Sequence, residues 1–384
     1  MSGVVIAGID MIPFGRFPDR SLEDLGAEAA LMALADADLT IHDVQALYCG
    51  SALQATAFPG QRVLRRIGQR TMPVLNVVNG CATGASAFRE AVLAVASGRH
   101  DVALAVGVEK MDRGLIVMPG RPSGFQEEGA IGTITTPCMF SQAGVVHSAA
   151  YGTTFEQYAK VSVKNHHHAT MNDKAFVRRE TPLEEVMASE MIAYPNTKLM
   201  CSINVDGAAA AIVTSEAFAR KHGLMARAVR VRVAASLASV FTEMEDGLTD
   251  FNEVTRETAK LAYESAGLGV EDIDLVELHD CFATAELLHY ENLGLCAKGE
   301  SGALIDSGET ALGGRLPVNV SGGLLSKGHP LGATGIANLY EICLHLRGEA
   351  GMRQVEGARL GLAHIVGGMT DYGSACAVHI LERA

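Results

Sequence analysis

The sequence predicts an α/β protein built from two copies of one structural unit. Residues 39–50, a short turn followed by an apolar strand pattern, resemble residues 268–279, and each segment follows a stretch of helical composition. Residues 76–80 likewise resemble residues 319–323, and both lead through a glycine-containing turn into an apolar helix. Because the two similarities occur in the same order, they indicate an internal duplication whose helices cover mainly parallel or mixed sheets.

Local patterns predict the individual elements of the first copy. Residues 4–12 form an apolar run that is typical of a buried strand. Ser21 is expected to cap an alanine-rich helix that ends near Ala37, because Asp24 stands at the third position of a capping box. Residues 82–96 again have the composition and apolar spacing of a helix.

The composition changes between the two copies. Residues 114–152 are rich in Gly, Pro, Ser and Thr and predict long loops, whereas residues 154–170 predict a helix. Residues 173–195 are charged and irregular, and the composition of a buried core returns at residues 201–213. We therefore expect residues 115–200 to be an insertion over one half, where a ligand-covering lobe would lie.

Composition also bears on partners and compartment. Of 384 residues, 48% are hydrophobic and 20% charged, and the net charge of −13 argues against binding of nucleic acid or anionic membranes. No apolar stretch reaches the roughly 18 residues of a membrane span, and no basic segment precedes the first apolar run, so we expect a cytoplasmic protein. The eight cysteines include no Cys-x-x-Cys pair, which favours reduced thiols over disulfides or a structural zinc site.

One cysteine stands where a strand is expected to turn into a helix. Cys81 follows Gly80 and precedes the helix predicted over residues 82–96. The unpaired N–H groups and partial positive charge of a helix N-terminus favour a thiolate and can hold an oxyanion, which makes Cys81 a candidate nucleophile. The alternative is a small hydrophobic residue on a packed turn.

The second copy places a histidine and another cysteine at a similar turn. The strand predicted over residues 273–278 ends in His279, Asp280 and Cys281, ahead of a helical stretch. Open α/β sheets bind ligands at the carboxyl ends of their strands, and side chains two residues apart face the same side of an extended backbone. The alternative is that Asp280 caps a helix beside a buried cysteine.

A third segment, residues 322–335, sets one histidine among five glycines and a proline. Gly328 and Pro330 restrict the backbone on either side of His329, which suits an imidazole that must be aimed. The segment lacks the Gly-x-x-x-x-Gly-Lys-Ser/Thr spacing of a phosphate-binding loop.

These segments together supply the groups of a thiol-based acyl transfer. Cys81, His279, Cys281 and His329 provide a nucleophile, a second thiol able to carry a proton, and two imidazoles. The strings that contain them, Gly-Cys-Ala-Thr-Gly, His-Asp-Cys-Phe and Gly-His-Pro-Leu-Gly-Ala-Thr-Gly, resemble the three signature motifs of the thiolase superfamily. The His-Asp-Cys-Phe form resembles the sterol-carrier-type thiolases, and the resemblance spans essentially the whole chain.

The resemblance implies a thiolase fold, internally duplicated and layered αβαβα, with an inserted loop domain over the active site. Residues 1–114 plus 201–222 would then form the N-terminal half, residues 115–200 the inserted loop domain, and residues 223–384 the C-terminal half.

It also implies a mechanism. Cys81, deprotonated with help from His329, would attack the ketone of a 3-ketoacyl-CoA and keep the acyl group. His279 and His329 would stabilise the enolate that leaves, and Cys281 would protonate it and later deprotonate the incoming CoA. The reverse reaction is a Claisen condensation. Coenzyme A is then a co-substrate, and no permanently bound cofactor and no metal are expected.

The C-terminal segment departs from the common pattern of the family. His364 stands where most thiolases carry a proton-moving cysteine, as it does in the sterol-carrier type, so the resemblance assigns that role to Cys281. The backbone N–H of Cys81 and that of Val366 or Gly367 are expected to form an oxyanion hole.

Two groups in the predicted lobe have alternative interpretations. Lys174, Arg178 and Arg179 are candidates for binding the phosphates of coenzyme A, and ordinary surface charge is the alternative. Residues 166–168 are three consecutive histidines, which point in different directions on a helix and have no further ligand at suitable spacing. A packing or solvated face is therefore favoured over a metal site.

The resemblance implies a homodimer or homotetramer that binds acyl-CoA and CoA. Some relatives of the sterol-carrier-like branch act with a small OB-fold and zinc-ribbon partner on bulky, aromatic or steroid-derived CoA esters, and both features stay open here. One rival function is a retro-aldolase or acyltransferase on the same fold. The other is a non-catalytic lipid- or acyl-CoA-binding protein. The presence of Cys81, Cys281 and His329 together favours the thiolase.

Overall fold

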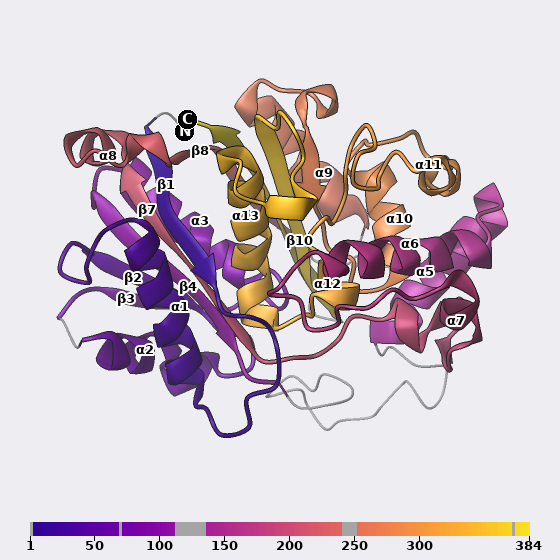
Figure 1. Cartoon of the computed structure of the whole chain (residues 1–384), viewed down its shortest axis with the longest axis horizontal. Helices are drawn as coiled ribbons and strands as arrows, with labels where there is room; N and C mark the ends of the chain where they lie inside the picture. The colour runs from indigo at the N-terminus through magenta and orange to yellow at the C-terminus, as the bar shows by residue number, and fades with distance from the viewer. Residues whose placement is uncertain (1–2, 69–70, 112–135, 240–251, 371–372) are drawn as a thin grey trace.

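The computed structural model describes residues 3–68, 71–111, 136–239, 252–370 and 373–384. Its strands are β1 (Val4–Met11), β2 (Ala46–Gly50), β3 (Val74–Val77), β4 (Val102–Glu109), β5 (Met191–Ala193), β6 (Asn196–Thr197), β7 (Gly207–Ser215), β8 (Val229–Ser239), β9 (Leu275–Glu277), β10 (Leu360–Thr370) and β11 (Gly373–Arg383). Within the described residues they form one large sheet of order β3-β2-β4-β7-β1-β8-β11-β10-β9 and the hairpin β5–β6 (Figure 1).

The large sheet confirms the predicted duplication. In the N-terminal half, β1 pairs antiparallel with β7, β7 antiparallel with β4, β4 parallel with β2, and β2 parallel with β3. In the C-terminal half, β8 pairs antiparallel with β11, β11 antiparallel with β10, and β10 parallel with β9. Val276 of β9 then makes a parallel bridge to Val318, in the place of β3. The halves join edge to edge where Val5 and Ile6 of β1 pair with β8.

Helices cover both faces of each half. The main ones are α1 (Leu22–Asp36), α2 (Pro59–Ile67), α3 (Thr83–Ala96), α8 (Glu216–Lys221), α9 (Asn252–Ala266) and α13 (Leu331–Arg347). α3 and α13 lie side by side in the middle of the molecule, whereas α1 packs on β1 and β7 and α9 on β8 and β11 (Figure 1). The predicted αβαβα layering is confirmed. α1 begins at the predicted capping box, in which Ser21 Oγ accepts the backbone N–H of Asp24 at 3.2 Å.

Apolar side chains fill the spaces between these layers. β4 is buried along its whole length and β7 along all but its last residue, as expected for strands with both faces covered. No helix in the described ranges combines the length and the apolarity needed to cross a membrane.

Glycines let the N-terminal ends of α3 and α13 approach each other closely. A Cβ atom at Gly335 would lie 2.4 Å from the backbone nitrogen of Ala85, and one at Gly84 would lie 2.4 Å from the carbonyl oxygen of Gly332. Any larger residue would force the helices apart. Because Cys81 and His329 stand just ahead of these two helices, the same contact brings them together.

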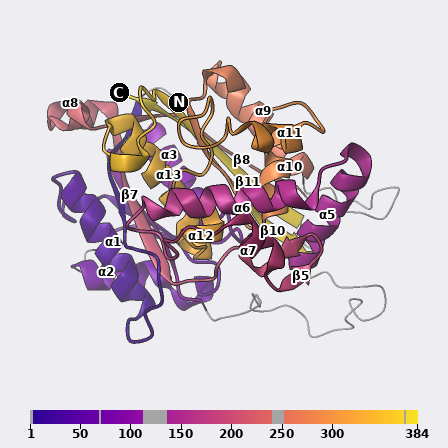
Figure 2. The same ribbon diagram turned by 45° about the vertical axis from the view of Figure 1, so that its right-hand side comes forward.

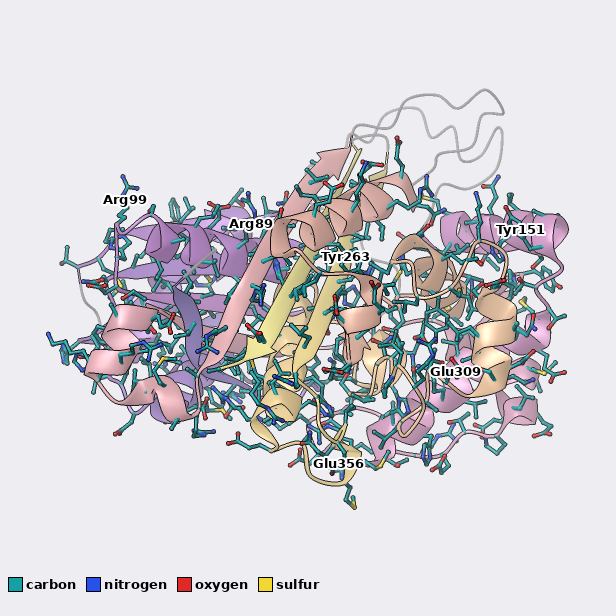
Figure 3. All side chains as sticks on the ribbon, turned by 90° about the horizontal axis from the view of Figure 1, so that it is seen from above. Arg89, Arg99, Tyr151, Tyr263, Glu309 and Glu356 are labelled. Atoms are coloured by element: carbon teal, nitrogen blue, oxygen red, sulfur yellow. The ribbon has the colours of Figure 1, made fainter. Side chains whose placement is uncertain are left out.

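The inserted lobe packs on the C-terminal half, although its sequence interrupts the N-terminal half. Its described helices are α5 (Thr136–Tyr151), α6 (Phe155–Thr170) and α7 (Leu183–Ala188). α5 rests on α10 (Ala283–Asn292), and α6 rests on α10, α11 (Ser301–Ser307) and α12 (Gly323–Ser326), whereas α7 packs against α6. α6 runs across the molecule beside α12 (Figure 2). Tyr151 of the lobe and Arg99 of the N-terminal half lie at opposite ends of the molecule (Figure 3).

The prediction of long loops over residues 114–152 is wrong for the part that the structure describes. α5 occupies residues 136–151. A Cβ atom at Gly144 would lie 2.6 Å from a methyl carbon of Thr284, so the glycine lets α5 lie directly on α10. This packing stabilises a helix whose composition alone favours a loop. Residues 112–135 lie outside the described residues, and the division into three domains stays a prediction.

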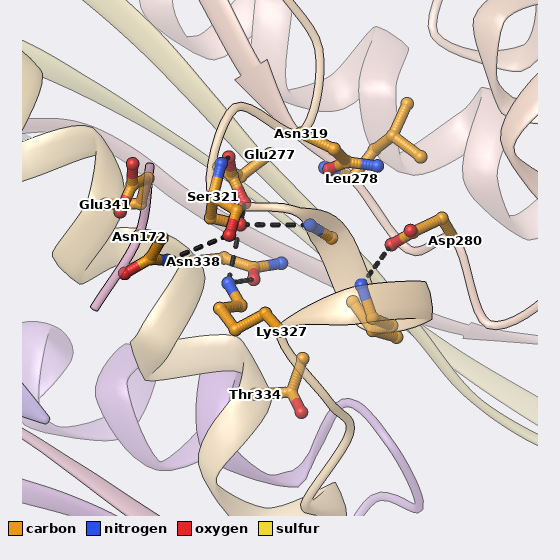
Figure 4. A network of polar contacts seen from close by, with 12 residues as sticks. Asn172, Glu277, Leu278, Asp280, Asn319, Ser321, Lys327, Thr334, Asn338 and Glu341 are labelled. Atoms are coloured by element: carbon orange, nitrogen blue, oxygen red, sulfur yellow. Dashed lines mark hydrogen bonds and ion pairs between the residues drawn. The ribbon is translucent and has the colours of Figure 1, made fainter. Parts of the chain in front are cut away.

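A buried ion pair holds the segment before His329. Lys327 Nζ lies 3.6 Å from the Glu277 carboxylate and donates a hydrogen bond to Asn338 Oδ1 at 3.2 Å (Figure 4). Glu277 also accepts the backbone N–H and the hydroxyl of Ser321, at 3.0 and 2.6 Å. Both charged side chains are at most 1% exposed, so each charge is tolerated only because the other is present.

We expect Lys327→Met to lower the free energy of unfolding by about 3–5 kcal/mol, because it leaves the Glu277 carboxylate buried without a counter-charge. Urea titration at pH 7 measures this. The matched control is Arg179→Met, which removes the exposed ion pair with Glu185. Water already screens that pair, so no measurable change is expected. Equal losses in the two variants would contradict the importance of the buried pair.

Candidate active site

The structure brings a thiol and two imidazoles to one point between the halves. The Sγ atom of Cys81 and one ring nitrogen each of His279 and His329 all lie within 4.8 Å of one another. The two rings have centroids 5.4 Å apart and planes inclined at 60°. Cys81 lies between β3 and α3, His279 between β9 and α10, and His329 between α12 and α13, so three separate connections meet here.

Two glycines allow β10 to lie against the turn that carries Cys81. Gly80 has φ +54°, a left-handed conformation that favours glycine, and a Cβ atom there would lie 2.5 Å from the nitrogen of Gly368. A Cβ atom at Gly367 would lie 2.0 Å from the carbonyl oxygen of Asn79 and 2.8 Å from the nitrogen of Cys81. The predicted turn between strand and helix is confirmed. The assignment of Val366 or Gly367 to an oxyanion hole stays a prediction, and the closeness of Gly367 to the Cys81 nitrogen agrees with it.

The Cys81 thiol is protonated in the resting protein. Burial raises its pKa to about 12, and the nearby Glu109 carboxylate acts in the same direction, whereas the backbone N–H of Cys81 lowers it. The backbone N–H does favour a thiolate, as expected for a helix N-terminus, but the cost of burying the charge is larger and the net pKa is raised. A base must take the proton when the reaction starts.

His329 is held in the tautomer that can serve as this base. Its Nδ1 lies 2.8 Å from Thr334 Oγ1, and the Thr334 hydroxyl donates to the carbonyl oxygen of Pro330 at 2.9 Å. Thr334 Oγ1 must then accept from Nδ1–H, which leaves the lone pair on Nε2. Nε2 is buried and has no hydrogen-bond partner within the described residues. Burial first, and the positive charge of Lys327 second, lower the pKa of His329 to about 3, so the ring is neutral.

His279 is likewise neutral and available. Its side chain is 2% exposed, and neither ring nitrogen has a hydrogen-bond partner in the described part of the chain. Burial, and then the neighbouring His329, lower its pKa well below the ordinary value. Behind it, His364 Nδ1 accepts the backbone N–H of His279 at 3.5 Å, while its ring packs edge-on against His289 with centroids 4.5 Å apart.

Cys281 lies next to this group and is buried. Burial first, and the neighbouring Cys81 second, raise its pKa well above the ordinary value, so it is a proton donor at rest. The adjacent Asp280 does cap a helix, as the alternative interpretation held. It caps α12 rather than the following helix, because its carboxylate accepts the N–H groups of Leu324 and Leu325 at 2.8 and 3.3 Å. Asp280 therefore caps a helix while the adjacent Cys281 thiol belongs to the site.

Glu109 is a residue that sequence reasoning missed. This buried carboxyl group ends β4 and accepts hydrogen bonds from Ser51 Oγ and from the nitrogens of Ala52, Leu53 and Gly332, at 2.7–3.2 Å. It thereby ties the glycine segment after His329 to the N-terminal half. Burial raises its pKa to about 7. The available signal was a single carboxylate at the end of the otherwise apolar run 102–109.

The three cations of the lobe have different surroundings. Lys174 Nζ is paired with the Asp10 carboxylate and donates to the carbonyl oxygen of Met11 at 2.6 Å. Arg179 forms an exposed ion pair with Glu185, whereas Arg178 is exposed and has no ion pair among the described residues. Their role in binding coenzyme A stays a prediction, for which Arg178 is the candidate without an ion pair in the described part of the chain.

The three consecutive histidines do not share a direction. His168 is buried, with Nδ1 3.0 Å from the carbonyl oxygen of Asn319 and Nε2 accepting the N–H of Leu312 at 3.0 Å. His167 is exposed beside Glu180, and His166 is buried. The packing face favoured from the sequence is confirmed for His166 and His168.

Comparison with known proteins agrees with this geometry. Residues 4–185 match the family model described as "Thiolase, N-terminal domain", and residues 234–383 match "Thiolase C-terminal domain-like". The chain belongs to the thiolase family. The resemblance drawn from the three motifs is thus confirmed, and it covers both halves of the duplicated thiolase fold.

Several thiolase relatives match over almost all of the chain. Sterol carrier protein 2 of Bos taurus is 39% identical over 95% of this chain and 70% of its own length. An acetyl-CoA acetyltransferase of Methanothermobacter thermautotrophicus is 39% identical over 100% of both chains. Benzoylsuccinyl-CoA thiolase subunit BbsB of Thauera aromatica is 35% identical over 95% of this chain and 94% of its own.

A solved structure extends the comparison to three dimensions. The structure titled "Ltp2-ChsH2(DUF35) aldolase" superposes with a TM-score of 0.82 and 25% identity, covering 99% of this chain and 98% of that chain. The thiolase fold of this chain is therefore also found in a protein whose title names an aldolase.

We expect the rate of Cys81 alkylation by iodoacetamide to rise continuously from pH 7 to pH 10. A pKa raised to about 12 keeps the thiol protonated over this range, so each step in pH increases the small thiolate fraction. Peptide mass spectrometry of the Cys81 peptide measures the rate, and free cysteine, whose rate levels off above its ordinary pKa, is the control. A plateau below pH 8 would show instead that the resting enzyme holds a thiolate.

We expect Thr334→Val to slow acylation of Cys81 by about 10- to 100-fold, because the His329 ring loses the acceptor that fixes its tautomer and orientation. Thr334→Ser keeps the hydroxyl and is expected to retain most of the rate. Rapid-mixing mass spectrometry with a 3-ketoacyl-CoA measures acylation, and urea titration checks that both variants are equally stable. Equal rates for the Val and Ser variants would remove Thr334 from the mechanism.

Proposed function

We propose that this thiolase cleaves 3-ketoacyl-CoA esters, or forms them by Claisen condensation, through an acyl-Cys81 intermediate. The observation that carries the proposal is the meeting of the Cys81 thiol with two neutral imidazoles, all within 4.8 Å. His329 Nε2 and both ring nitrogens of His279 have no hydrogen-bond partner among the described residues. A neutral thiol beside a neutral base has the correct protonation state for the first step.

In the first half-reaction, His329 Nε2 takes the proton of Cys81, and the sulfur attacks the keto carbon of the substrate. The oxyanion lies toward the backbone N–H of Cys81 and that of Val366 or Gly367. The carbon–carbon bond then breaks, the acyl group stays on Cys81, and the electrons pass to an enolate next to His279. Cys281 gives this enolate its proton and becomes a thiolate.

In the second half-reaction, the Cys281 thiolate takes the proton of an incoming CoA thiol. The CoA sulfur attacks the acyl-enzyme, and Cys81 leaves and recovers its proton from His329. Both thiols and both imidazoles return to their starting states, so each turnover leaves no net change in the protein.

We propose that the acyl group is bulky or aromatic. Support comes from an apolar cluster around Cys81 formed by Ala52, Leu53, Met111 and Leu331, and from the name of the relative BbsB. Coenzyme A is the co-substrate, with Arg178 as the candidate for its phosphates. No permanently bound cofactor is proposed.

Assembly forms a further part of the proposal. β3 is an edge strand of the large sheet, and Leu75 within it and Val78 directly after it are 49% and 50% exposed. This supports pairing with a second copy in a homodimer or homotetramer. The printed names "subunit BbsB" and "Ltp2-ChsH2(DUF35)" support an additional small partner protein.

A cytoplasmic location is proposed because all eight cysteines are free.

A retro-aldolase on the same fold is the second candidate. The observation that favours it is the aldolase title of a structural neighbour with a TM-score of 0.82. A retro-aldol cleavage releases an aldehyde or ketone and requires no acyl-enzyme, so the two reactions leave different products on the protein.

The test is incubation of the chain with linear, aromatic and steroid-derived 3-ketoacyl-CoA esters, followed by intact mass measurement. The proposal expects an acyl adduct on wild type and on Cys296→Ser, none on Cys81→Ser, and release of the adduct by free CoA. Parallel incubation with 3-hydroxyacyl-CoA esters tests the aldolase. Release of an aldehyde or ketone from the 3-hydroxyacyl-CoA esters, without an acyl adduct, would show that the protein is an aldolase and not a thiolase. Neither an acyl adduct nor a released aldehyde or ketone, in the presence of a partner protein, would indicate a binding protein.

A further inference from the structure

The site contains the donor set of a soft metal centre as well as that of a thiolase. In the described ranges, Cys81, His279 and His329 are the one group of three His, Cys, Asp or Glu residues whose donor atoms are close enough to hold a metal ion. One sulfur and two imidazole nitrogens are the ligands that Zn²⁺ prefers, and three protein ligands leave its fourth position open.

The donor atoms are free to bind. His329 Nε2 and both ring nitrogens of His279 are buried and have no hydrogen-bond partner among the described residues. The two side chains are 1% and 2% exposed, so these nitrogens are shielded from bulk solvent. A cation at the centre of the group would bind His329 Nε2 and one of the two ring nitrogens of His279.

The geometry needs only a small adjustment. Bond lengths to tetrahedral Zn²⁺ place neighbouring ligand atoms about 3.3–3.6 Å apart. The three donors already lie within 4.8 Å, so rotations that move each atom by about 1 Å complete the site. The hydrogen bond from His329 Nδ1 to Thr334 can persist during this change and would orient the ring as outer-shell partners do in zinc sites.

We infer that the free enzyme binds one Zn²⁺ or similar thiophilic divalent ion at Cys81, His279 and His329, and that this ion reversibly blocks the nucleophile. Binding forms one metal–sulfur bond and two metal–nitrogen bonds and releases the Cys81 proton to solvent. No oxidant or reductant is required. An acyl group on Cys81 removes the thiolate donor, so acylation and metal binding exclude each other. The ion is an inhibitor in this inference and not a cofactor.

The experiment adds Co²⁺ in steps to the metal-free protein and records the absorption spectrum, which depends on the ligands of the bound Co²⁺. Zn²⁺ is then added to displace the Co²⁺. We expect one Co²⁺ per chain, a sulfur-to-cobalt charge-transfer band, and the intense visible bands of a four-coordinate ion. Cys81→Ser is expected to abolish the charge-transfer band. His329→Gln is expected to weaken binding by more than the about 10- to 100-fold that loss of an outer-shell partner causes.

Further measurements make the result specific. Cys296→Ser, a partly buried thiol outside the group, is expected to bind as wild type does, and Mg²⁺ is expected not to compete because it prefers oxygen ligands. Zn²⁺ is also expected to protect Cys81 from iodoacetamide. Circular dichroism confirms that each variant is folded. An unchanged Co²⁺ spectrum in Cys81→Ser, or no binding to folded wild type, would overturn the inference. Neither outcome affects the acyl-adduct test, because no substrate is used here.

Discussion

The close approach of α3 and α13 is the constraint on which the rest of the structure depends. A Cβ atom at Gly335 would lie 2.4 Å from the Ala85 nitrogen, and one at Gly84 would lie 2.4 Å from the Gly332 carbonyl oxygen. The two helices come from equivalent positions in the duplicated halves, and each is preceded by one of the reactive residues. A gene duplication alone would leave two separate turns, and the glycine contact makes them one site.

Burial then decides the protonation state of that site. It raises the pKa of Cys81 to about 12 and lowers that of His329 to about 3, so both groups are neutral at rest. A preformed thiolate–imidazolium pair would be a strong nucleophile at all times, whereas this arrangement generates the nucleophile only when a substrate supplies stabilisation for the developing negative charge. The same absence of charge and hydrogen bonds leaves the donor atoms open to a soft metal ion.

Buried polar contacts hold the connections that carry these residues. Glu109 links the N-terminal half to Gly332, and Asp280 links the segment after β9 to α12. Asn165 of the lobe donates to both Asp280 and Glu286 at 2.8 Å, so the lobe is anchored to the segment that contains Cys281. Each polar group is unfavourable in the interior by itself, and therefore the network holds the loops in one arrangement.

Local sequence determined much of this protein. The capping box at Ser21, the turn at Cys81 and the three motifs each depend on residues close together in the chain, where spacing and glycine chemistry carry the information. The duplication was evident because distant segments repeat the same local patterns. Tertiary structure alone decided the helix over residues 136–151, the packing of the lobe on the opposite half, the part played by Glu109 and the raised pKa of Cys81. These features depend on contacts between residues distant in sequence and on removal of water, and neither is encoded in a local pattern.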